Sequence, residues 1–525
     1  MSAPPPIRLG IDLGTTRTVA VAVDRGRYPV ASFDLGGCFA DHLSGLAVHA
    51  GGRWWFGEQA RTRLANPEPS QFAVASVKRL VSTMAPDDPI EGVSEPCTAL
   101  MLLEAYVRWV RQMLVRHSNL ELPKAADAVL PVMVAVPANA STRQRYLTLE
   151  AFGRAGFNVL GLVNEPTAAA IEYAYREPVA LSPRSPKRYV MVYDLGGGTF
   201  DTAAVSLEGR RFDLLTSEGI AQLGGADFDA AIWQMVSEGL VEAGTPREAV
   251  EAVPLAAALE LCRDAKEGLR PSSRRLIVDP AALLPEAAPV VLRTDALYER
   301  CSPLIQRTID LVDELFGGVA KHGLDPEDSR QLGALYLVGG SVAFPPVARR
   351  LRERFGRKIK LSAQPHAATA MGLAVAADPS AEIRVREATT RHFGVWREAE
   401  DGREKVFDPI LTKDTMPTDE STLVVQRRYR PVHSVGHLRF LECTRLSGDG
   451  RPGGDLTPWQ ELRIPYDAEL TSSEQSLDEA PIERHGHAGS EVVETYTRAG
   501  DGTITVQVDN PSAAYQQRWV LGALR

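Results

Sequence analysis

Long apolar runs and blocks of like charge are both missing from this 525-residue sequence. No stretch approaches the roughly 18 to 20 apolar residues that cross a membrane, and the amino terminus, MSAPPPIRLG, carries neither a basic nor an apolar region. The formal net charge of −9 is spread along the chain, which disfavours a nucleic-acid partner held by a broad basic face. We therefore expect a cytoplasmic protein that binds neither membrane nor nucleic acid.

Cysteine is scarce, with five residues and no CxxC pair. Such scattered cysteines are typical of buried free thiols in a reducing compartment. The five are Cys38, Cys97, Cys262, Cys301 and Cys443.

Two common nucleotide-binding signatures are also absent. The sequence contains no G-x-x-x-x-G-K-[ST], which excludes a P-loop. No predicted strand is followed by G-x-G-x-x-G, so a dinucleotide-binding fold has no support.

An internal repeat is present instead. IRLGIDLGTTRTVAVAVD (7–24) and YVMVYDLGGGTFDTAAVSLEG (189–209) share one plan: a strand, Asp-Leu-Gly, small residues and a second strand. Elsewhere strands alternate with helices, as where Ser141 and Gln144 match a capping box and Pro166 falls in the first turn of a helix. This alternation predicts an α/β architecture up to about residue 380, and short β-branched runs after Thr390 predict a separate β-rich domain.

The glycines of the second copy, Gly196 to Gly198, suit a phosphate site. Successive backbone N–H groups form an anion-binding concavity there, and the missing side chains let the backbone approach the phosphate oxygens. Thr199 in this copy, with Thr15 and Thr16 in the first, adds further donors. A tight hairpin turn without a ligand is the alternative, but the repeat argues against it.

One aspartate precedes the glycine turn in each copy, Asp12 in the first and Asp194 in the second. A phosphate would repel these carboxylates unless a cation stood between them, so they indicate Mg²⁺, held largely through its own waters. The repeat thus predicts a nucleotide held between two related lobes, each of which provides one hairpin.

Six motifs carry a family resemblance. GIDLGTT, VPA (136–138), NEPTAAA, DLGGGTFD, LGGADFD and LVGGS occur in the order and at spacings comparable to those of the seventy-kilodalton heat-shock (DnaK-like) chaperones of the actin/hexokinase-type ATPase superfamily. The chain resembles a lidless, divergent member. The resemblance implies a duplicated actin-like ATPase fold with two lobes and four subdomains over residues 1–380, a linker at 381–390 and an all-β, sandwich-like domain for a substrate or partner at 391–525.

The same resemblance implies a role for each site residue. Lys78 would neutralise charge on the transferring phosphoryl group, Glu165 and Asp201 would orient the attacking water, and Thr199 would also serve catalysis. Asp12 and Asp194 would hold the magnesium ion. The residues implied for ATP or ADP are Gly14, Thr15, Thr16, Gly196, Gly197, Gly198, Thr199, Gly224, Gly225, Lys266, Gly339, Gly340 and Ser341.

Several positions near the expected adenosine depart from the family pattern. Arg17 replaces a small polar residue, and Ala343 stands where the family has its adenine-stacking arginine. Arg263 and Glu267 exchange the usual order of charges, and His366 replaces an acidic residue. Phosphate binding is thus better supported than adenine recognition.

The second domain departs as well. The linker reads EIRVRE (382–387), where arginines replace leucines that are buried in typical members. LVVQRRYRPVHS (423–434) places further arginines where small or apolar residues would line a peptide pocket.

Three hypotheses follow from the sequence. The preferred one is a slow, Mg²⁺-dependent ATPase that acts as a chaperone: its β-domain binds unfolded polypeptide, and co-chaperones are possible partners. The alternative is a nucleotide-regulated or catalytically weak binding protein with one dedicated protein partner. A small-molecule kinase of the same superfamily ranks last, because DLGGGTFD and the lysine segment resemble the chaperones.

Overall fold

A computed structural model describes residues 7–65, 71–93, 95–125, 128–178, 182, 184–326, 328–399, 404–413, 415–417, 422–471, 476–477, 480–485 and 488–521. The chain divides into two compact units, of which the first comprises Met1–Ala138 and Thr148–Val385 and the second Asn139–Leu147 and Arg386–Arg525. Within the described residues, no helix combines the length and the apolar character that a membrane crossing requires.

Two sheets of matching topology form the first unit. The first has the order β10-β9-β1-β2-β5, and its strands are β1 (Leu9–Leu13), β2 (Arg17–Ala22), β5 (Leu43–Ser44), β9 (Leu130–Val136) and β10 (Phe157–Asn164). The second has the order β17-β16-β11-β12-β13-β18, and its strands are β11 (Tyr189–Leu195), β12 (Phe200–Ser206), β13 (Arg211–Ile220), β16 (Leu332–Val338), β17 (Ile359–Leu361) and β18 (Arg384–Glu387). In each sheet an antiparallel hairpin, β1-β2 or β11-β12, continues into parallel strands on one side.

This correspondence confirms the duplication that the sequence repeat predicts. β11 is buried throughout, as expected for a central strand of a sheet with both faces covered. Helices α5 (Glu165–Arg176) and α11 (Ala368–Ala377) are in backbone contact where they cross. A Cβ on Gly372 would overlap the carbonyl group of Ala168, so this close approach requires glycine.

Up to Ala377 the chain also contains further short strands and helices. The short strands are β3 (Phe33–Asp34), β4 (Phe39–Ala40), β6 (Ala47–Ala50), β7 (Arg53–Phe56), β8 (Phe72–Val74), β14 (Arg275–Val278) and β15 (Val290–Arg293). The other helices are α1 (Gly57–Ala65), α2 (Val77–Val81), α3 (Ala99–His117), α4 (Thr142–Arg154), α6 (Gly225–Glu242), α7 (Arg247–Glu251), α8 (Leu255–Glu267), α9 (Thr294–Gly318) and α10 (Pro345–Phe355).

Two predicted helix starts are confirmed. The backbone N–H of Gln144 donates to Ser141 Oγ at 3.3 Å, and the N–H of Ser141 donates to Gln144 Oε1 at 3.0 Å, which is the reciprocal capping box. Pro166 lies in the first turn of α5, where its missing N–H removes no helical hydrogen bond.

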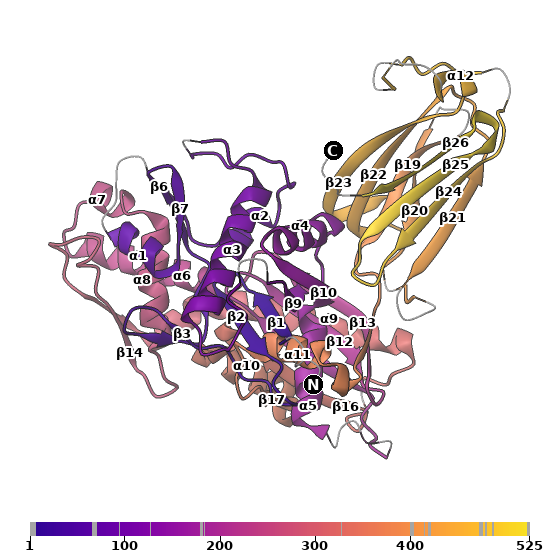
Figure 1. The fold of residues 1–525 in the computed structure, drawn as a ribbon. Coiled ribbons are helices and arrows are strands. Elements are labelled where there is room, and N and C mark those ends of the chain that lie inside the picture. The colour runs from indigo at the N-terminus through magenta and orange to yellow at the C-terminus, as the bar shows by residue number, and fades with distance from the viewer. Residues whose placement is uncertain are drawn as a thin grey trace. The chain divides into compact units, whose positions relative to one another are not determined.

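The second unit contains an all-β sandwich (Figure 1). One sheet has the order β20-β19-β22-β23 and the other β21-β24-β25-β26. Their strands are β19 (His392–Ala399), β20 (Glu404–Leu411), β21 (Leu423–Tyr429), β22 (Val435–Leu446), β23 (Pro452–Pro465), β24 (Val492–Arg498), β25 (Ile504–Asn510) and β26 (Tyr515–Val520), with one short helix, α12 (Ala468–Thr471). Phe393 and Val395 from the first sheet share a buried core with Tyr496 and Val506 from the second, so the sheets pack face to face.

The duplicated actin-like fold and the sandwich confirm the predicted fold class. The prediction that the cysteines are buried is correct for Cys262, Cys301 and Cys443 and wrong for two others. Cys38 is exposed in the turn between β3 and β4, and Cys97 is partly exposed before α3. Both lie in short connections, which run over the surface because their backbone groups need water.

Candidate functional site

A cavity of about 250 Å³ lies in the first unit at the turns of the two repeated hairpins. We name it the interlobe cavity, because its lining comes from both sheets: Gly14 to Arg17 from the first hairpin, and Asp194, Gly196, Gly197 and Thr199 from the second. Asp12 and Asp194 belong to the central strands β1 and β11 and lie near the strand ends, beside the glycine turns. The repeat therefore positions both aspartates and both turns around one space.

Several glycines at the cavity are required because neighbouring segments lie too close to leave room for a side chain. A Cβ on Gly197 would overlap the side chain of Thr16, so the two hairpins touch each other. A Cβ on Gly224 would lie 2.6 Å from the backbone nitrogen of Gly198. Gly339 has a φ of +86°, a left-handed conformation that suits glycine, and there too a side chain would overlap the backbone of Leu195.

Four carboxyl groups surround one lysine at the base of the cavity. Lys78 Nζ lies 2.6 Å from Glu165 Oε1, and both side chains are largely buried. Burial, reinforced by the charge of Glu165, raises the pKa of Asp12 and of Asp201 to about 7 and raises the pKa of Asp194 well above its ordinary value. Burial by itself would lower the pKa of Lys78, but Glu165 and Asp12 raise it, so the lysine is a firmly held cation.

Lys78 thus only partly offsets the burial and mutual repulsion that raise the pKa of these carboxyl groups. Asp12 Oδ1 is buried and accepts no hydrogen bond from the described residues. In the same part of the chain, no group of three or more His, Cys, Asp or Glu side chains is arranged to hold a metal directly. The site therefore fits Mg²⁺ bound by Asp12 and Asp194 together with phosphate oxygens and water, as this hard cation prefers.

One wall of the cavity is built around Lys266 of α8. Its Nζ lies 2.7 Å from Asp229 Oδ1 and donates to the carbonyl oxygen of Gly225 at 2.8 Å. Ser341 in the short 3-10 helix Gly340–Ala343 donates from Oγ to the carbonyl oxygen of Gly196 at 2.8 Å. These bonds join α8 to α6 and the 3-10 helix to the second hairpin.

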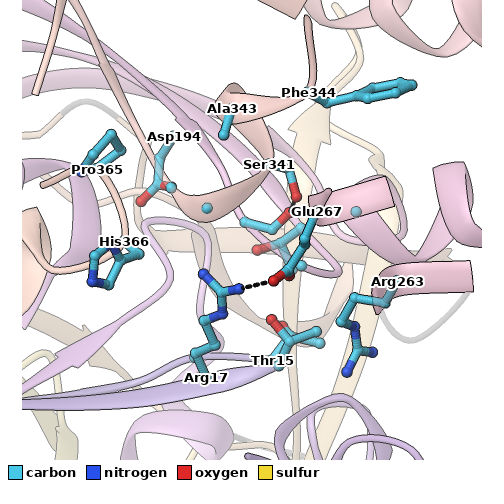
Figure 2. Close-up of a pocket in the computed structure, with 18 of the residues that line it drawn as sticks. Thr15, Arg17, Asp194, Arg263, Glu267, Ser341, Ala343, Phe344, Pro365 and His366 are labelled. Atoms are coloured by element: carbon cyan, nitrogen blue, oxygen red, sulfur yellow. Dashed lines mark hydrogen bonds and ion pairs between the residues drawn. The ribbon is translucent and has the colours of Figure 1, made fainter. Parts of the chain in front are cut away.

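Two departures from the family pattern meet inside the cavity. Arg17, the first residue of β2, extends toward Glu267, the last residue of α8, and Nη2 lies 2.5 Å from Oε2 (Figure 2). Arg263, also on α8, pairs with Glu260 and lies 3.9 Å from Asp229. The exchanged charges of α8 therefore have local partners, and Arg17 is the partner of Glu267.

Ala343, Phe344 and His366 line another part of the cavity. Ala343 presents only a methyl group there (Figure 2). The ring of the next residue, Phe344, is buried and packs on Phe228 with centroids 5.0 Å apart. His366 also lines the cavity, and its Nε2 lies 2.7 Å from Asp41 Oδ2. Hydrogen bonds from His366 and His42 hold the pKa of Asp41 well below its usual range.

Most of the predicted site residues line this one cavity. They are Asp12, Gly14, Thr15, Thr16, Lys78, Glu165, Asp194, Gly196, Gly197, Thr199, Gly225, Lys266, Gly339, Gly340 and Ser341. Asp201, Gly198 and Gly224 lie behind the lining: Asp201 is buried opposite Asp194 in the β11-β12 pair, and the two glycines pack against each other.

Several lining residues were not predicted as part of the site, among them Asp229 and Arg17. Asp229 is the last residue of the motif LGGADFD and lies on the buried face of α6. Its spacing of four residues from Trp233 on that face is the signal that could have identified it, because a charged residue is rarely buried without a partner. Arg17 was recognised only as a departure from the family pattern. Nothing in the local sequence indicates that its partner lies 250 positions away.

Comparison with known proteins gives consistent results. The model of the Hsp70 protein family matches residues 118–389. The chain belongs to the Hsp70 family. Among curated Hsp70 relatives, a chaperone protein HscA homolog of Pseudomonas fluorescens is 31% identical over 392 residues, which cover 71% of this chain and 57% of the relative. HscA homologs of Burkholderia pseudomallei and Burkholderia mallei are each 30% identical over 386 residues, which cover 71% of this chain and 58% of theirs. The match thus spans less than two thirds of these Hsp70 relatives.

Proposed function

We propose that this Hsp70 protein binds ATP with Mg²⁺ in the interlobe cavity, hydrolyses it slowly, and binds unfolded polypeptide through its β-domain. The observation that carries the proposal is the placement of Lys78 and Glu165 among Asp12, Asp194 and Asp201, next to two glycine turns that can receive phosphate groups.

Each group has a defined part in hydrolysis. The backbone N–H groups of the two turns bind phosphate oxygens. Asp12 and Asp194 would hold Mg²⁺, which would neutralise phosphate charge. Glu165 accepts a hydrogen bond from the attacking water and so orients it toward the γ-phosphorus. Asp201 helps to orient the same water. Lys78 stabilises the charge of the transferring phosphoryl group, and the products are ADP and inorganic phosphate.

The decisive measurement is ATP hydrolysis by the purified chain with and without an unfolded polypeptide, beside Lys78→Ala and Asp194→Ala variants. We expect hydrolysis that falls at least tenfold in both variants and rises when polypeptide is added. A rate equal to that of the variants would refute the ATPase. Lys187→Ala, a lysine outside the cavity whose Nζ bonds the carbonyl oxygen of Leu332 at 2.6 Å, is the matched control.

A second candidate is a binding protein with one dedicated partner, whose nucleotide domain acts as a switch. The arginines at the inner positions of the sandwich favour it, because Arg397 and Arg427 replace apolar surface that a general chaperone would offer to unfolded chains. Hydrolysis that is indifferent to unfolded polypeptide would support this candidate.

A further inference from the structure

A second cavity, of about 500 Å³, lies wholly within the sandwich. We name it the sandwich cavity; it is lined by parts of β19, β20, β21 and β22 and by the segment Arg430–His433. Two carboxylates line it, Glu398 and Asp408, and basic residues outnumber them. The basic lining residues are Arg397, Lys405, Arg427, Arg428, Arg430 and Arg439. The cavity is therefore locally positive in a chain whose net charge is −9.

The floor of the sandwich cavity is a closed ionic network. Strand alternation places Arg397 and Arg427 at inner positions, where Arg397 Nη2 lies 2.7 Å from the fully buried Glu494. Asp408 bridges the two arginines at 2.7 and 3.0 Å, and Tyr429 donates to Glu494 at 2.5 Å. Each buried charge thus has a partner. The floor presents polar groups, which are poor contacts for an apolar side chain of a ligand.

The rim differs from the floor, because its cations are incompletely neutralised. Arg430 and Lys405 are exposed, and neither forms an ion pair with any residue the structure describes. Arg428 reaches only the exposed Glu491, at 3.4 Å, and Arg439 lies 3.7 Å from Glu461. His433 also lines the cavity, and its buried Nδ1 has no hydrogen-bond partner in the described part of the chain.

The backbone around the sandwich cavity suits an extended ligand. β20 and β21 each end their sheet, so within the described residues each pairs with a neighbour on one side only. Unpaired strand edges bind extended peptides through main-chain hydrogen bonds. Phosphate-rich nucleic acid is the less suitable anion, since Glu398 and Asp408 stand among the arginines and the chain as a whole is acidic.

We propose that the sandwich cavity binds an extended, acidic peptide segment, whose carboxylates lie against Arg430, Lys405 and Arg428. The inference rests on the proposed function, because it names the class of polypeptide that the β-domain takes. Charge pairs at such a partly exposed rim give specificity and speed of association, and salt weakens them.

The test measures binding of three fluorescein-labelled twelve-residue peptides to the full chain by anisotropy: one rich in Glu, its Gln isostere, and one rich in Leu. We expect the acidic peptide to bind at least tenfold more tightly than its isostere, and less tightly at 200 mM than at 50 mM salt. Arg430→Glu should weaken binding tenfold or more. Arg451→Glu, which makes the same charge change at an exposed turn outside the cavity, should stay within twofold.

Other outcomes would overturn the inference. Preference for the leucine-rich peptide would mean that the cavity does not select acidic segments. Equal losses of affinity in Arg430→Glu and Arg451→Glu would mean that the overall charge of the chain, and not the cavity, attracts the peptide. Tighter binding of a single-stranded oligonucleotide would point to a different anion. Acidic-peptide binding without any ATP hydrolysis would instead refute the proposed ATPase and leave this inference standing.

Discussion

Arg17 and Glu267, 250 positions apart in the chain, face each other across the interlobe cavity with Nη2 2.5 Å from Oε2. Arg17 follows the glycine turn of the first hairpin, and Glu267 ends the helix that also carries Lys266. The ion pair thus connects the first hairpin to helix α8 across the cavity.

Reversal of this pair should affect nucleotide binding. Arg17→Glu places a negative charge beside the phosphates and opposite Glu267, so we expect ADP affinity to fall about tenfold by isothermal titration calorimetry. Adding Glu267→Arg should recover about two- to fivefold, the coupling expected for a partly exposed pair. The exposed pair Arg210 and Glu382, outside the cavity, is the control, and its reversal should leave ADP affinity unchanged. No recovery in the double variant would show that the pair is not coupled to nucleotide.

If Asp12 holds magnesium as proposed, a substitution there should change how strongly magnesium assists nucleotide binding. Asp12→Asn removes a carboxylate that repels phosphate and that would hold the ion. In EDTA we therefore expect ADP to bind the variant more tightly than the unsubstituted chain. With Mg²⁺ we expect ADP to bind the variant more weakly. The measurement is the ratio of the two dissociation constants, with Asp24→Asn in an exposed turn as the control. An unchanged ratio would mean that Asp12 does not hold magnesium.

Gly224→Ala should disrupt the second hairpin. The added Cβ meets backbone atoms of Gly197 and Gly198, which have no rotamer by which to move away, so we expect a loss of about 1–3 kcal/mol in unfolding free energy and weaker ADP binding. Gly317→Ala in α9, where a Cβ meets nothing within 4 Å, should instead stabilise by about 0.5–1 kcal/mol. Urea unfolding of both variants checks the contrast, and equal effects would contradict it.

The ionic floor of the sandwich makes its stability pH-dependent. Burial would raise the pKa of Asp408, but hydrogen bonds from Arg427 and Arg397 lower it below the usual value. The folded protein therefore binds fewer protons here than the unfolded chain, and this stability is present above about pH 4 and lost as pH falls further. We expect Asp408→Asn to cost about 1–3 kcal/mol at pH 7 and much less near pH 3.

Hydrogen exchange of β24 peptides in urea at both pH values measures this loss within the full chain. Asp509→Asn on β25, whose carboxylate bonds only the amides of Gln507 and Gln516 among the described residues, is the control and should show a small cost. A pH-independent cost for Asp408→Asn would show that its charge is not what stabilises the floor.

The sequence alone predicts most of the residues of the candidate site, because that site is built from local features. A glycine turn after a buried strand depends on neighbouring residues. The same holds for the helix cap at Ser141 and for Pro166 in the first turn of α5, and the structure contains both. The repeat then implies that two such turns face each other, which their shared cavity and the close approach of Gly197 to Thr16 confirm.

Contacts between distant segments could not be predicted in this way. The exposure of Cys38 depends on where a short connection lies, and the pairing of Lys266 with Asp229 depends on how two helices pack. Likewise, the sequence indicated arginines in the sandwich but not that Asp408 and Glu494 neutralise the inner two.

For this chain, then, residue order by itself determined the paired hairpins, the aspartates beside their turns and the change from α/β to all-β structure, since each follows from the chemistry of adjacent residues. Tertiary structure alone decided the partner of Arg17 and which arginines of the sandwich are neutralised and which remain at its rim. The physical reason is that an ion pair requires two charges within about 4 Å, and only packing brings together residues that are distant in the chain.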